Sequence, residues 1–264
     1  MDLQLKGRRA VVTGSTAGIG WAIALRLAQE GAQVLVNGRT QAAVDRALQR
    51  IREICPGARV SGCAADLGTA EGCAAIAPPV AEADILVNNL GIYEPGEFAQ
   101  TPDAVWSRFF EVNVMSGVRL SRTALPAMLA RGWGRIVFVS SESGINPPPE
   151  MVHYGMTKAA QLSVSRGIAE ATVGTAVTVN AVLPGPTRTE GSSAFIERLS
   201  REQGLPPAEV ERRYFEQDRP SSLIRRFIEP AEVGATVAFL CSPLAAATNG
   251  AAVRVDGGVV RSMT

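Results

Sequence analysis

The sequence predicts an α/β protein with a single-domain, doubly wound fold of about seven parallel strands flanked by helices. Short apolar runs bounded by turn residues alternate with longer amphipathic segments. A glycine-rich turn joins the first apolar run to a helical segment, and no linker or repeat interrupts the pattern between residues 1 and 264. Hydrophobic residues make up 46% of the 264 positions, which is enough for one large buried core.

Composition excludes several classes of function. The chain carries 26 basic and 25 acidic residues, a formal net charge of +1, so it has no electrostatic footprint for nucleic acid or an anionic membrane. The four cysteines lack Cys-x2-Cys spacing and His153 is the single histidine, so we expect no metal site. Because the chain lacks an apolar signal core and a run of roughly 18 uncharged apolar residues, we expect a cytoplasmic protein with a small-molecule partner.

The first strand–helix–strand unit offers a phosphate site. Residues 9–12 form an apolar run, and residues 13–20, Thr-Gly-Ser-Thr-Ala-Gly-Ile-Gly, lead into a helical segment before a second strand at residues 33–36. Glycines let backbone amides approach a phosphate closely, and a helix N-terminus adds unpaired N–H groups and the positive end of a dipole. The spacing Gly-x3-Gly-x-Gly differs from the commoner Gly-x-Gly-x2-Gly, but its place between a strand and a helix predicts a dinucleotide pyrophosphate here.

The next unit begins with an outer helix. Apolar residues alternate with charged ones over residues 41–54, and residues 59–64 form a third strand that Asp66 and Leu67 terminate. Asp66 is also a candidate N-cap for a helix that begins at Thr69.

A buried strand at residues 85–87 runs into the turn 88–91, Asn-Asn-Leu-Gly. Thr101 is the expected N-cap of the following segment, with Pro102 at the first helical position, and apolar periodicity continues through Leu120. We therefore predict one long helix here.

The fifth strand, at residues 134–139, is followed by polar residues. An open parallel sheet binds its ligand at the carboxyl edge, where Ser141 is the first candidate and Ser140 and Ser143 are its competitors. The proline-rich residues 146–150 are expected to form a stiff loop beside the pocket.

Tyr154 and Lys158 lie four residues apart in a segment predicted to be helical as far as Val173, so both side chains project from one face. Two unit charges about 4 Å apart interact by ~4 kcal/mol at an effective dielectric of about 20, enough to lower the tyrosine pKa by nearly three units. Lys158 is thus expected to make Tyr154 a working acid and base near neutral pH. His153 is expected to be solvated or a helix cap, outside the site.

The last third of the chain completes the sheet. Residues 176–183 form a strand that leads into the turn 184–189, and residues 230–241 and 252–258 form the final helix and strand. Residues 191–229, between the turn 184–189 and the final helix, are charged and irregular. We predict that they form a substrate lid, with an ordinary surface insertion as the alternative.

Thr13-Gly14-x3-Gly18-Ile19-Gly20 and Tyr154-x3-Lys158 together resemble the short-chain dehydrogenase/reductase (SDR) family, and the resemblance covers nearly the whole chain. It implies one dinucleotide-binding catalytic domain with a Rossmann fold, which transfers hydride between nicotinamide and a carbonyl or secondary alcohol. It also implies catalytic roles for four residues. Tyr154 moves the proton, Ser141 positions the oxygen, Lys158 lowers the phenol pKa and binds the ribose, and Asn113 holds a water beside Lys158.

The resemblance also assigns the cofactor site. Asp66 would lie beside the adenine, the backbone near Thr187 and the hydroxyl of Thr189 would hold the nicotinamide carboxamide, and Leu90 departs from the alanine of the family's Asn-Asn-Ala-Gly turn. The candidate cofactor-binding residues are Gly14, Ser15, Thr16, Gly18, Ile19, Gly20, Arg39, Asp66, Leu67, Asn89, Gly91, Tyr154, Lys158, Pro184, Gly185, Thr187 and Thr189.

The end of the second strand favours NADP over NAD. Position 38 is glycine, so the acidic residue that would accept hydrogen bonds from a free 2′-hydroxyl is missing there. Arg39 can clasp a 2′-phosphate through two charge-assisted bonds, with Asn37 and Thr40 as weaker helpers. Ala17 counts against this preference, because many NADP-using relatives carry a basic residue there, so NAD use stays open.

Two other functions are compatible with the fold: a catalytically silent dinucleotide sensor and, less well, a methyltransferase. Neither explains why Asn113, Ser141, Tyr154 and Lys158 occur together. The resemblance and the apolar stretches at residues 159–173 and 259–260 predict a homo-oligomer, a tetramer or dimer. The substrate stays open, and the arginines near the lid hint at an anion.

Overall fold

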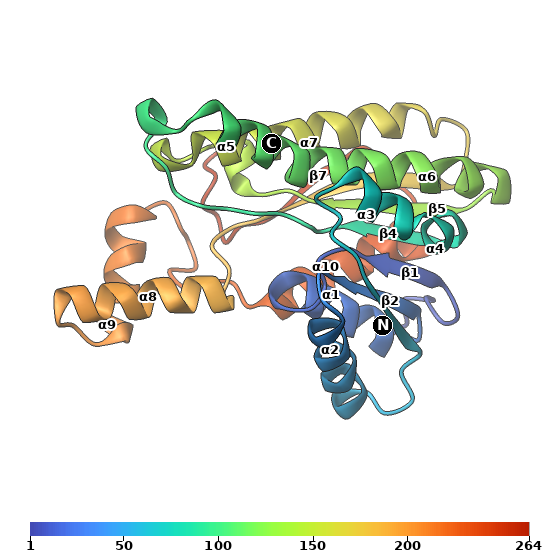
Figure 1. Ribbon diagram of the computed structural model, residues 1–264, viewed down its shortest axis with the longest axis horizontal. Helices are drawn as coiled ribbons and strands as arrows, with labels where there is room; N and C mark the ends of the chain where they lie inside the picture. Colours follow the sequence, from blue (N-terminus) through green and yellow to red (C-terminus); the bar gives the residue numbers. More distant parts are fainter. Residues whose placement is uncertain (264) are drawn as a thin grey trace.

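The computed structural model describes residues 1–263 and places seven parallel strands in one sheet (Figure 1). The strand order is β3-β2-β1-β4-β5-β6-β7, so β1 and β4 lie side by side where the winding direction reverses. The strands are β1 (Arg9–Val12), β2 (Gln33–Gly38), β3 (Val60–Ala64), β4 (Ile85–Asn88), β5 (Gly134–Val139), β6 (Val177–Pro184) and β7 (Ala252–Val255). This confirms the predicted doubly wound fold.

Helices cover both faces of the sheet. Residues of α1, α2 and α10 form one apolar core against it, and residues of α3, α4, α6 and α7 form the other. The helices are α1 (Gly18–Gln29), α2 (Gln41–Ile54), α3 (Ala70–Ala75), α4 (Ala77–Glu82), α5 (Asp103–Phe110), α6 (Ser116–Arg131), α7 (Val152–Glu170), α8 (Glu190–Gln203), α9 (Pro207–Arg213) and α10 (Pro230–Cys241). No helix within residues 1–263 is both long enough and apolar enough to cross a bilayer.

Successive strand residues point into opposite cores. In β4, Ile85 and Val87 belong to the core with α1 and α10, whereas Leu86 belongs to the core with α4 and α6. All three are fully buried. Because both faces of a parallel sheet are covered, β4 is apolar at consecutive positions rather than at alternate ones.

The long helix predicted from Thr101 is shorter at its start and interrupted in its middle. Its first helical residue is Asp103, the N-cap is Pro102, and the Thr101 hydroxyl donates instead to Glu97 O at 2.8 Å. A π-helical turn at Glu111–Met115 separates α5 from α6. Such turns are rare and often mark functional sites.

Other local predictions also need correction. The segment 191–229 is largely helical: it forms α8, α9 and a π-helical turn at Tyr214–Asp218, and these project from the body of the sheet (Figure 1). Its apolar side chains form their own core, built from Ile196, Val210, Phe215 and Phe227, which explains why a charged segment folds. Helix α7 ends at Glu170, before the exposed Val173, and a 3₁₀ turn lies within the proline-rich loop at Pro149–Met151.

Candidate active site

The carboxyl ends of β1, β4, β5 and β6 bring together the segments that carry the predicted site. These four strands are consecutive neighbours in the sheet, and the winding direction reverses between β1 and β4, where open parallel sheets bind their ligands. Within residues 1–263, no cluster of three or more His, Cys, Asp or Glu side chains could hold a metal ion.

The glycine-rich turn after β1 leaves the start of α1 free for an anion. Gly14 and Gly18 have φ angles of 57° and 54°, in the left-handed region that favours glycine. Helix α1 follows Ala17, which provides no side-chain cap, and its first turn has no acidic residue. The Ser15 hydroxyl turns inward and donates to Val12 O at 2.6 Å. The first N–H groups of α1 are therefore available to a phosphate.

Asn89, from the turn after β4, holds this loop in place. Its side-chain nitrogen donates to Thr13 O at 2.9 Å and to Gly14 O at 3.0 Å. A Cβ at Gly20 would lie 2.3 Å from the same nitrogen, so that position cannot carry a side chain without moving Asn89. Ile19 is partly buried against the neighbouring core.

Two residues expected to assist a 2′-phosphate are engaged elsewhere. The Asn37 side chain accepts from Gly14 N at 3.1 Å and donates to Cys63 O and Ala65 O. The Thr40 hydroxyl caps the first turn of α2. Both side chains stabilise the loops around the site. The Asn37 amide is buried and its nitrogen already donates to two carbonyls, which corrects the expectation that it contacts a 2′-phosphate, whereas the contact from the exposed Thr40 stays a prediction.

Arg39 and Gly38 fit the predicted adenosine end. Arg39 is exposed, and within residues 1–263 its side chain forms no hydrogen bond or ion pair. A Cβ at Gly38 would lie 2.4 Å from the methyl of Thr16, so an acidic residue there requires Thr16 to move.

Asp66 and Leu67 differ in what they can offer. Asp66 is exposed and its carboxylate accepts from Gly68 N at 3.0 Å, whereas the N-cap of α3 is Thr69. The alternative that Asp66 is this N-cap is therefore wrong. The Leu67 side chain is buried in the core, so its main chain alone could face a cofactor.

The loop after β6 is tied down on both sides. β6 ends at Pro184, and a Cβ at Gly185 would lie 2.7 Å from Asp256 O. The Thr187 hydroxyl donates to Gly185 O at 2.8 Å, and Thr187 pairs with Ile228 in a parallel bridge. Thr187 is buried, and its hydroxyl is already engaged within the loop.

The start of α8 closes over the glycine-rich turn. Thr189 is the N-cap of α8, and its side chain would contact a Cβ placed on Gly18 at 3.4 Å. A Cβ on Gly191 would lie 2.0 Å from the Tyr93 hydroxyl, and the Tyr93 ring lies edge-on to Tyr154 at 6.5 Å. Sequence reasoning did not select Tyr93, which connects α8 to Tyr154.

Of the three serines after β5, Ser141 faces Tyr154. The Ser140 hydroxyl donates to Lys158 O at 2.8 Å and anchors α7. Ser143 contributes its backbone N–H, which donates to Ser141 Oγ at 3.1 Å. A hydrogen bond between Ser141 and Tyr154 lowers the pKa of the phenol.

Glu142 is the most informative residue that sequence reasoning left unassigned. The Ser141 hydroxyl donates to Glu142 Oε2 at 2.5 Å, and Glu142 is 7% exposed. Burial raises the pKa of Glu142, while its hydrogen bond with Ser141 and the charge of Arg219 lower it. An acid directly after the candidate serine was the only available signal.

The pKa of Tyr154 departs from the expectation. Burial raises it, the negative charge of Glu142 raises it further, and the hydrogen bond with Ser141 does not offset them. Lys158 Nζ lies 5.5 Å from the centre of the Tyr154 ring. The prediction that Lys158 overcomes burial is therefore wrong for this arrangement, and the phenol is protonated at neutral pH.

Lys158 is buried and held by two acceptors. Its ammonium donates to Val139 O at 3.0 Å and to Gln161 Oε1 at 3.2 Å. A Cβ at Gly91 would lie 3.4 Å from Nζ, so the turn after β4 borders the ammonium. Burial lowers the pKa of Lys158 to about 8, although Glu142 opposes this.

Asn113 lies in the π-helical turn and is buried. Its side chain accepts from Ile92 N at 2.8 Å and donates to Ile92 O and to Thr157 Oγ1, both at 3.0 Å. The side chain therefore braces the β4 turn against α7, and the main-chain carbonyl is the part directed toward Lys158 through Gln161.

His153 lies outside the site, but not for the expected reason. It is buried, its Nε2 lies 3.0 Å from Glu94 O, and its ring packs edge-on against Phe109 and Trp106. It is a core residue rather than a solvated or capping one.

The arginines near the predicted lid are largely neutralised. Arg188 contacts Glu211 and Glu229, and Arg219 lies 3.8 Å from Glu150. The other ion pairs of this region are Arg198–Glu202, Arg212–Glu209, Arg212–Glu216, Arg213–Glu209 and Arg226–Glu232. Since these guanidinium groups have partners, they no longer favour an anionic substrate.

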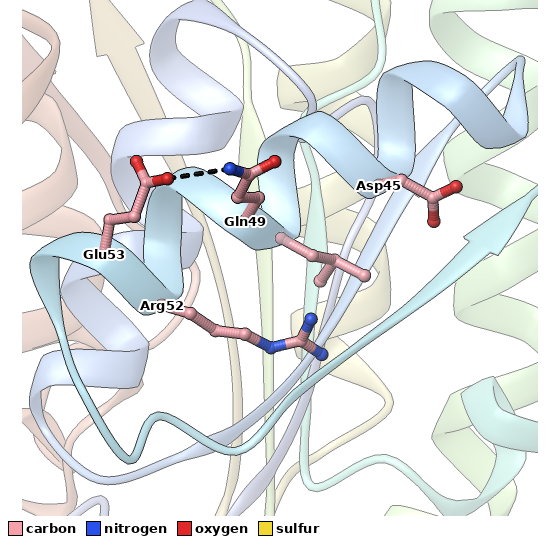
Figure 2. A pocket seen from close by; sticks show the side chains of 5 residues that line it. Asp45, Gln49, Arg52 and Glu53 are labelled. Atoms are coloured by element: carbon pink, nitrogen blue, oxygen red, sulfur yellow. Dashed lines mark hydrogen bonds between the residues drawn. The ribbon is translucent and has the colours of Figure 1, made fainter.

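A separate hollow of about 560 Å³ lies on α2 and is lined by Asp45, Leu48, Gln49, Arg52 and Glu53 (Figure 2). Figure 2 shows Gln49 bonded to Glu53 along the helix surface. No predicted site residue lines this hollow, so we do not connect it with catalysis.

The residues at the sheet edge fit a nicotinamide dinucleotide. Uncapped amides at the start of α1 suit a pyrophosphate, and the φ of 54° at Gly18 lies in the left-handed region that other residues rarely adopt. Further along, Ser141, Tyr154 and Lys158 provide a hydroxyl donor, a transferable proton and a cation. That set can protonate a carbonyl oxygen or deprotonate an alcohol.

Comparisons with known proteins agree with this chemistry. The family model described as "Enoyl-(Acyl carrier protein) reductase" matches residues 14–260. "Uncharacterized oxidoreductase YvaG" of Bacillus subtilis is 49% identical over 263 residues, covering 100% of both chains. D-beta-hydroxybutyrate dehydrogenase of Cupriavidus necator is 35% identical, covering 97% of this chain and 99% of its own.

Solved structures with a similar fold are also reductases. L-sorbose reductase from Gluconobacter frateurii, complexed with NADPH and L-sorbose, has a TM-score of 0.93 and 32% identity, covering 100% of both chains. The NADPH-dependent reductase YwfH, involved in bacilysin biosynthesis, has a TM-score of 0.88 and 25% identity, covering 98% of this chain and 100% of its own.

Proposed function

The chain belongs to the short-chain dehydrogenase/reductase family, and from this premise we propose that it is an NAD(P)-dependent oxidoreductase acting on a carbonyl or secondary alcohol group. The observation that carries the proposal is the grouping of Ser141, Tyr154 and Lys158 beside the turn after β4, which Asn89 ties to the glycine-rich turn. The named relatives are dehydrogenases and reductases, so nothing supports the silent-sensor alternative.

When bound, the nicotinamide supplies or accepts the hydride. In reduction, Tyr154 gives its hydroxyl proton to the substrate oxygen as hydride reaches the carbon. Ser141 donates a hydrogen bond to the same oxygen, where negative charge develops. Because the Ser141 hydrogen is directed at Glu142, this donation requires the hydroxyl to rotate away from the carboxyl group. In oxidation, Tyr154 takes the alcohol proton instead.

The raised pKa of Tyr154 keeps the phenol in the protonated form that reduction uses. A protonated phenol is ready to act as the acid, whereas oxidation first needs the phenolate. Lys158 stabilises that anion as it forms and holds the ribose, and Asn113 fixes the loop and helix that carry both groups.

NADP(H) is the favoured cofactor. Solved relatives are complexes with NADPH or NADP, and the free guanidinium of Arg39 follows β2 where the 2′-phosphate would lie. Gly38 offers no carboxylate to repel that phosphate. NAD(H) remains a second possibility for the same site.

The substrate we propose is a small polar ketone or its alcohol, and polyols and ketoses come first. Relatives include L-sorbose reductase and galactitol 2-dehydrogenase. The buried carboxyl group of Glu142 beside Ser141 offers an acceptor to a substrate hydroxyl, and the paired arginines offer little to an anion.

We also propose that residues 191–229 act as the lid of this pocket within a single catalytic domain spanning residues 1–264, because α8 begins against Tyr93 and the glycine-rich turn.

We further propose a cytoplasmic homo-oligomer, a tetramer or dimer. The family resemblance and the unpaired outer edge of β7 support it. Val259 and Val260 no longer do, because both are buried within the chain itself. Light scattering that shows only monomer across micromolar concentrations would remove the proposal.

The test of the activity is a panel of ketoses, polyols, β-keto acids and simple ketones, assayed with NADPH, NADH and their oxidised forms. We expect NADPH-dependent reduction of at least one ketose or polar ketone. Dinucleotide binding without turnover of any panel member would favour the sensor instead.

A further inference from the structure

Gln161 occupies the space between the two residues that anchor the proton chemistry. It lies on α7 one turn after Lys158, and its side chain is almost fully buried. Its Oε1 accepts from Lys158 Nζ at 3.2 Å, and its Nε2 donates to the main-chain carbonyl of Asn113 at 2.5 Å. One amide therefore bridges the ammonium and the π-helical turn.

The orientation of this amide is dictated by its partners. An ammonium only donates hydrogen bonds and a main-chain carbonyl only accepts them, so the oxygen must face Lys158 and the nitrogen must face Asn113. No other side chain in the described structure bonds to Asn113 O or, apart from Gln161, to Lys158 Nζ.

We propose that Gln161 is a positioning residue of the reaction, whose side-chain amide joins Lys158 to Asn113 in place of the water that the family resemblance assigns to that link. The proposal rests on the proposed oxidoreductase function. It does not make Gln161 a catalytic residue, since the amide touches neither substrate nor the phenol.

Two consequences distinguish an amide from a water. The amide is part of the protein chain and cannot exchange with solvent as a water can. It therefore holds the ammonium in a fixed position, where the ammonium also donates to Val139 O. It also has no readily ionisable proton, so it holds Lys158 without carrying protons between Lys158 and the π-helical turn.

The bridge also favours the charged form of Lys158, because a hydrogen bond accepted from an ammonium stabilises the ammonium. The charged and titratable groups facing Lys158 are Glu142, which also favours the charged form, and the phenol of Tyr154. Removing the bridge and replacing it with a carboxylate should therefore move the Lys158 pKa in opposite directions.

The test uses the two lysines of the chain, Lys6 and Lys158. Protein labelled with ¹³C at lysine Cε gives two NMR signals, assigned with Lys6→Arg. Gln161→Met keeps the length but removes both hydrogen bonds, and should lower the Lys158 pKa by about one unit. Gln161→Glu keeps the shape and adds a negative charge, and should raise it by about one unit or more.

The matched control is Gln49→Met, which alters an exposed glutamine on α2 (Figure 2) and should leave the Lys158 signal unchanged. With a substrate from the panel, Gln161→Met should lower kcat about tenfold and shift the pH profile in the same direction as the lysine titration.

If Gln161→Met does not fold, Gln161→Glu alone carries the titration test. An unchanged Lys158 pKa in the variants, or shifts of the same sign, would overturn the proposal. Opposite shifts in a protein that turns over no substrate would uphold the bridge and reject the oxidoreductase function.

Discussion

Lys158 should titrate far below an ordinary lysine. Its pKa falls from 10.5 to about 8, because burial penalises the ammonium by more than the charge of Glu142 favours it. A difference of about 2.5 pH units corresponds to roughly 3 kcal/mol at about 1.4 kcal/mol per unit. That free energy opposes folding in full below pH 8, where the folded protein must hold a buried ammonium.

The sign of the pH dependence follows from proton binding. Between about pH 8 and 10.5 the unfolded chain binds the lysine proton and the folded chain does not, so the free energy of unfolding rises with pH. Above pH 10.5 the opposing contribution is gone. Lys158→Met has no such group and should lack this rise.

The assay is urea unfolding of wild type and Lys158→Met at intervals from pH 7 to 10, without added cofactor, together with the ¹³C lysine titration. Taking the difference between the two proteins cancels the other groups that titrate in this range. We expect wild type to gain about 2–3 kcal/mol relative to the variant across the window. A difference that does not change with pH, or a Lys158 signal titrating at 10.5 or above, would refute the burial argument.

Two further predictions concern cofactor choice and the role of Glu142. Arg39→Ala should lower kcat/KM for NADPH by roughly ten- to a hundredfold, since a charge-assisted hydrogen bond contributes about 1.5–3 kcal/mol, and should leave NADH nearly unaffected; a wild type that prefers NADH would contradict this. Glu142→Gln removes a negative charge that raises the pKa of Tyr154, so the rising limb of kcat/KM for alcohol oxidation should move to lower pH; a limb that stays in place or moves upward would show that Glu142 does not act on the phenol.

Periodicity predicted the sheet and most of its helices because both layers obey simple spacing rules. Residues 41–54, 134–139 and 230–241 form the elements expected of them, with the same limits. Strands buried on both faces are continuously apolar, and outer helices carry one apolar stripe, so each pattern has one interpretation. The helices of the segment 191–229 were not predicted, because its apolar residues pack mainly on one another rather than on the sheet.

The site was less predictable wherever function depends on contacts between distant segments. Asn37 was expected to help hold a 2′-phosphate and instead holds the glycine-rich turn, and sequence reasoning did not select Gln161. The ionisation of Tyr154 depends on competition between burial and a cation, and spacing alone does not reveal which is stronger. Burial and the charge of Glu142 are the stronger effects here, and the Lys158 ammonium donates to Val139 O and Gln161 Oε1 rather than to the phenol.

The central claim is that Tyr154 transfers the proton during NADPH-dependent reduction. The most direct measurement is kcat of Tyr154→Phe for the best panel substrate, alongside the affinity of the same variant for NADPH measured by fluorescence. The substitution deletes the transferable proton and little binding surface, so we expect kcat to fall by at least about 10²-fold with NADPH affinity within a few fold of wild type. A variant that keeps more than about a tenth of wild-type kcat would contradict the account, because general acid catalysis typically contributes about 10²–10⁴-fold.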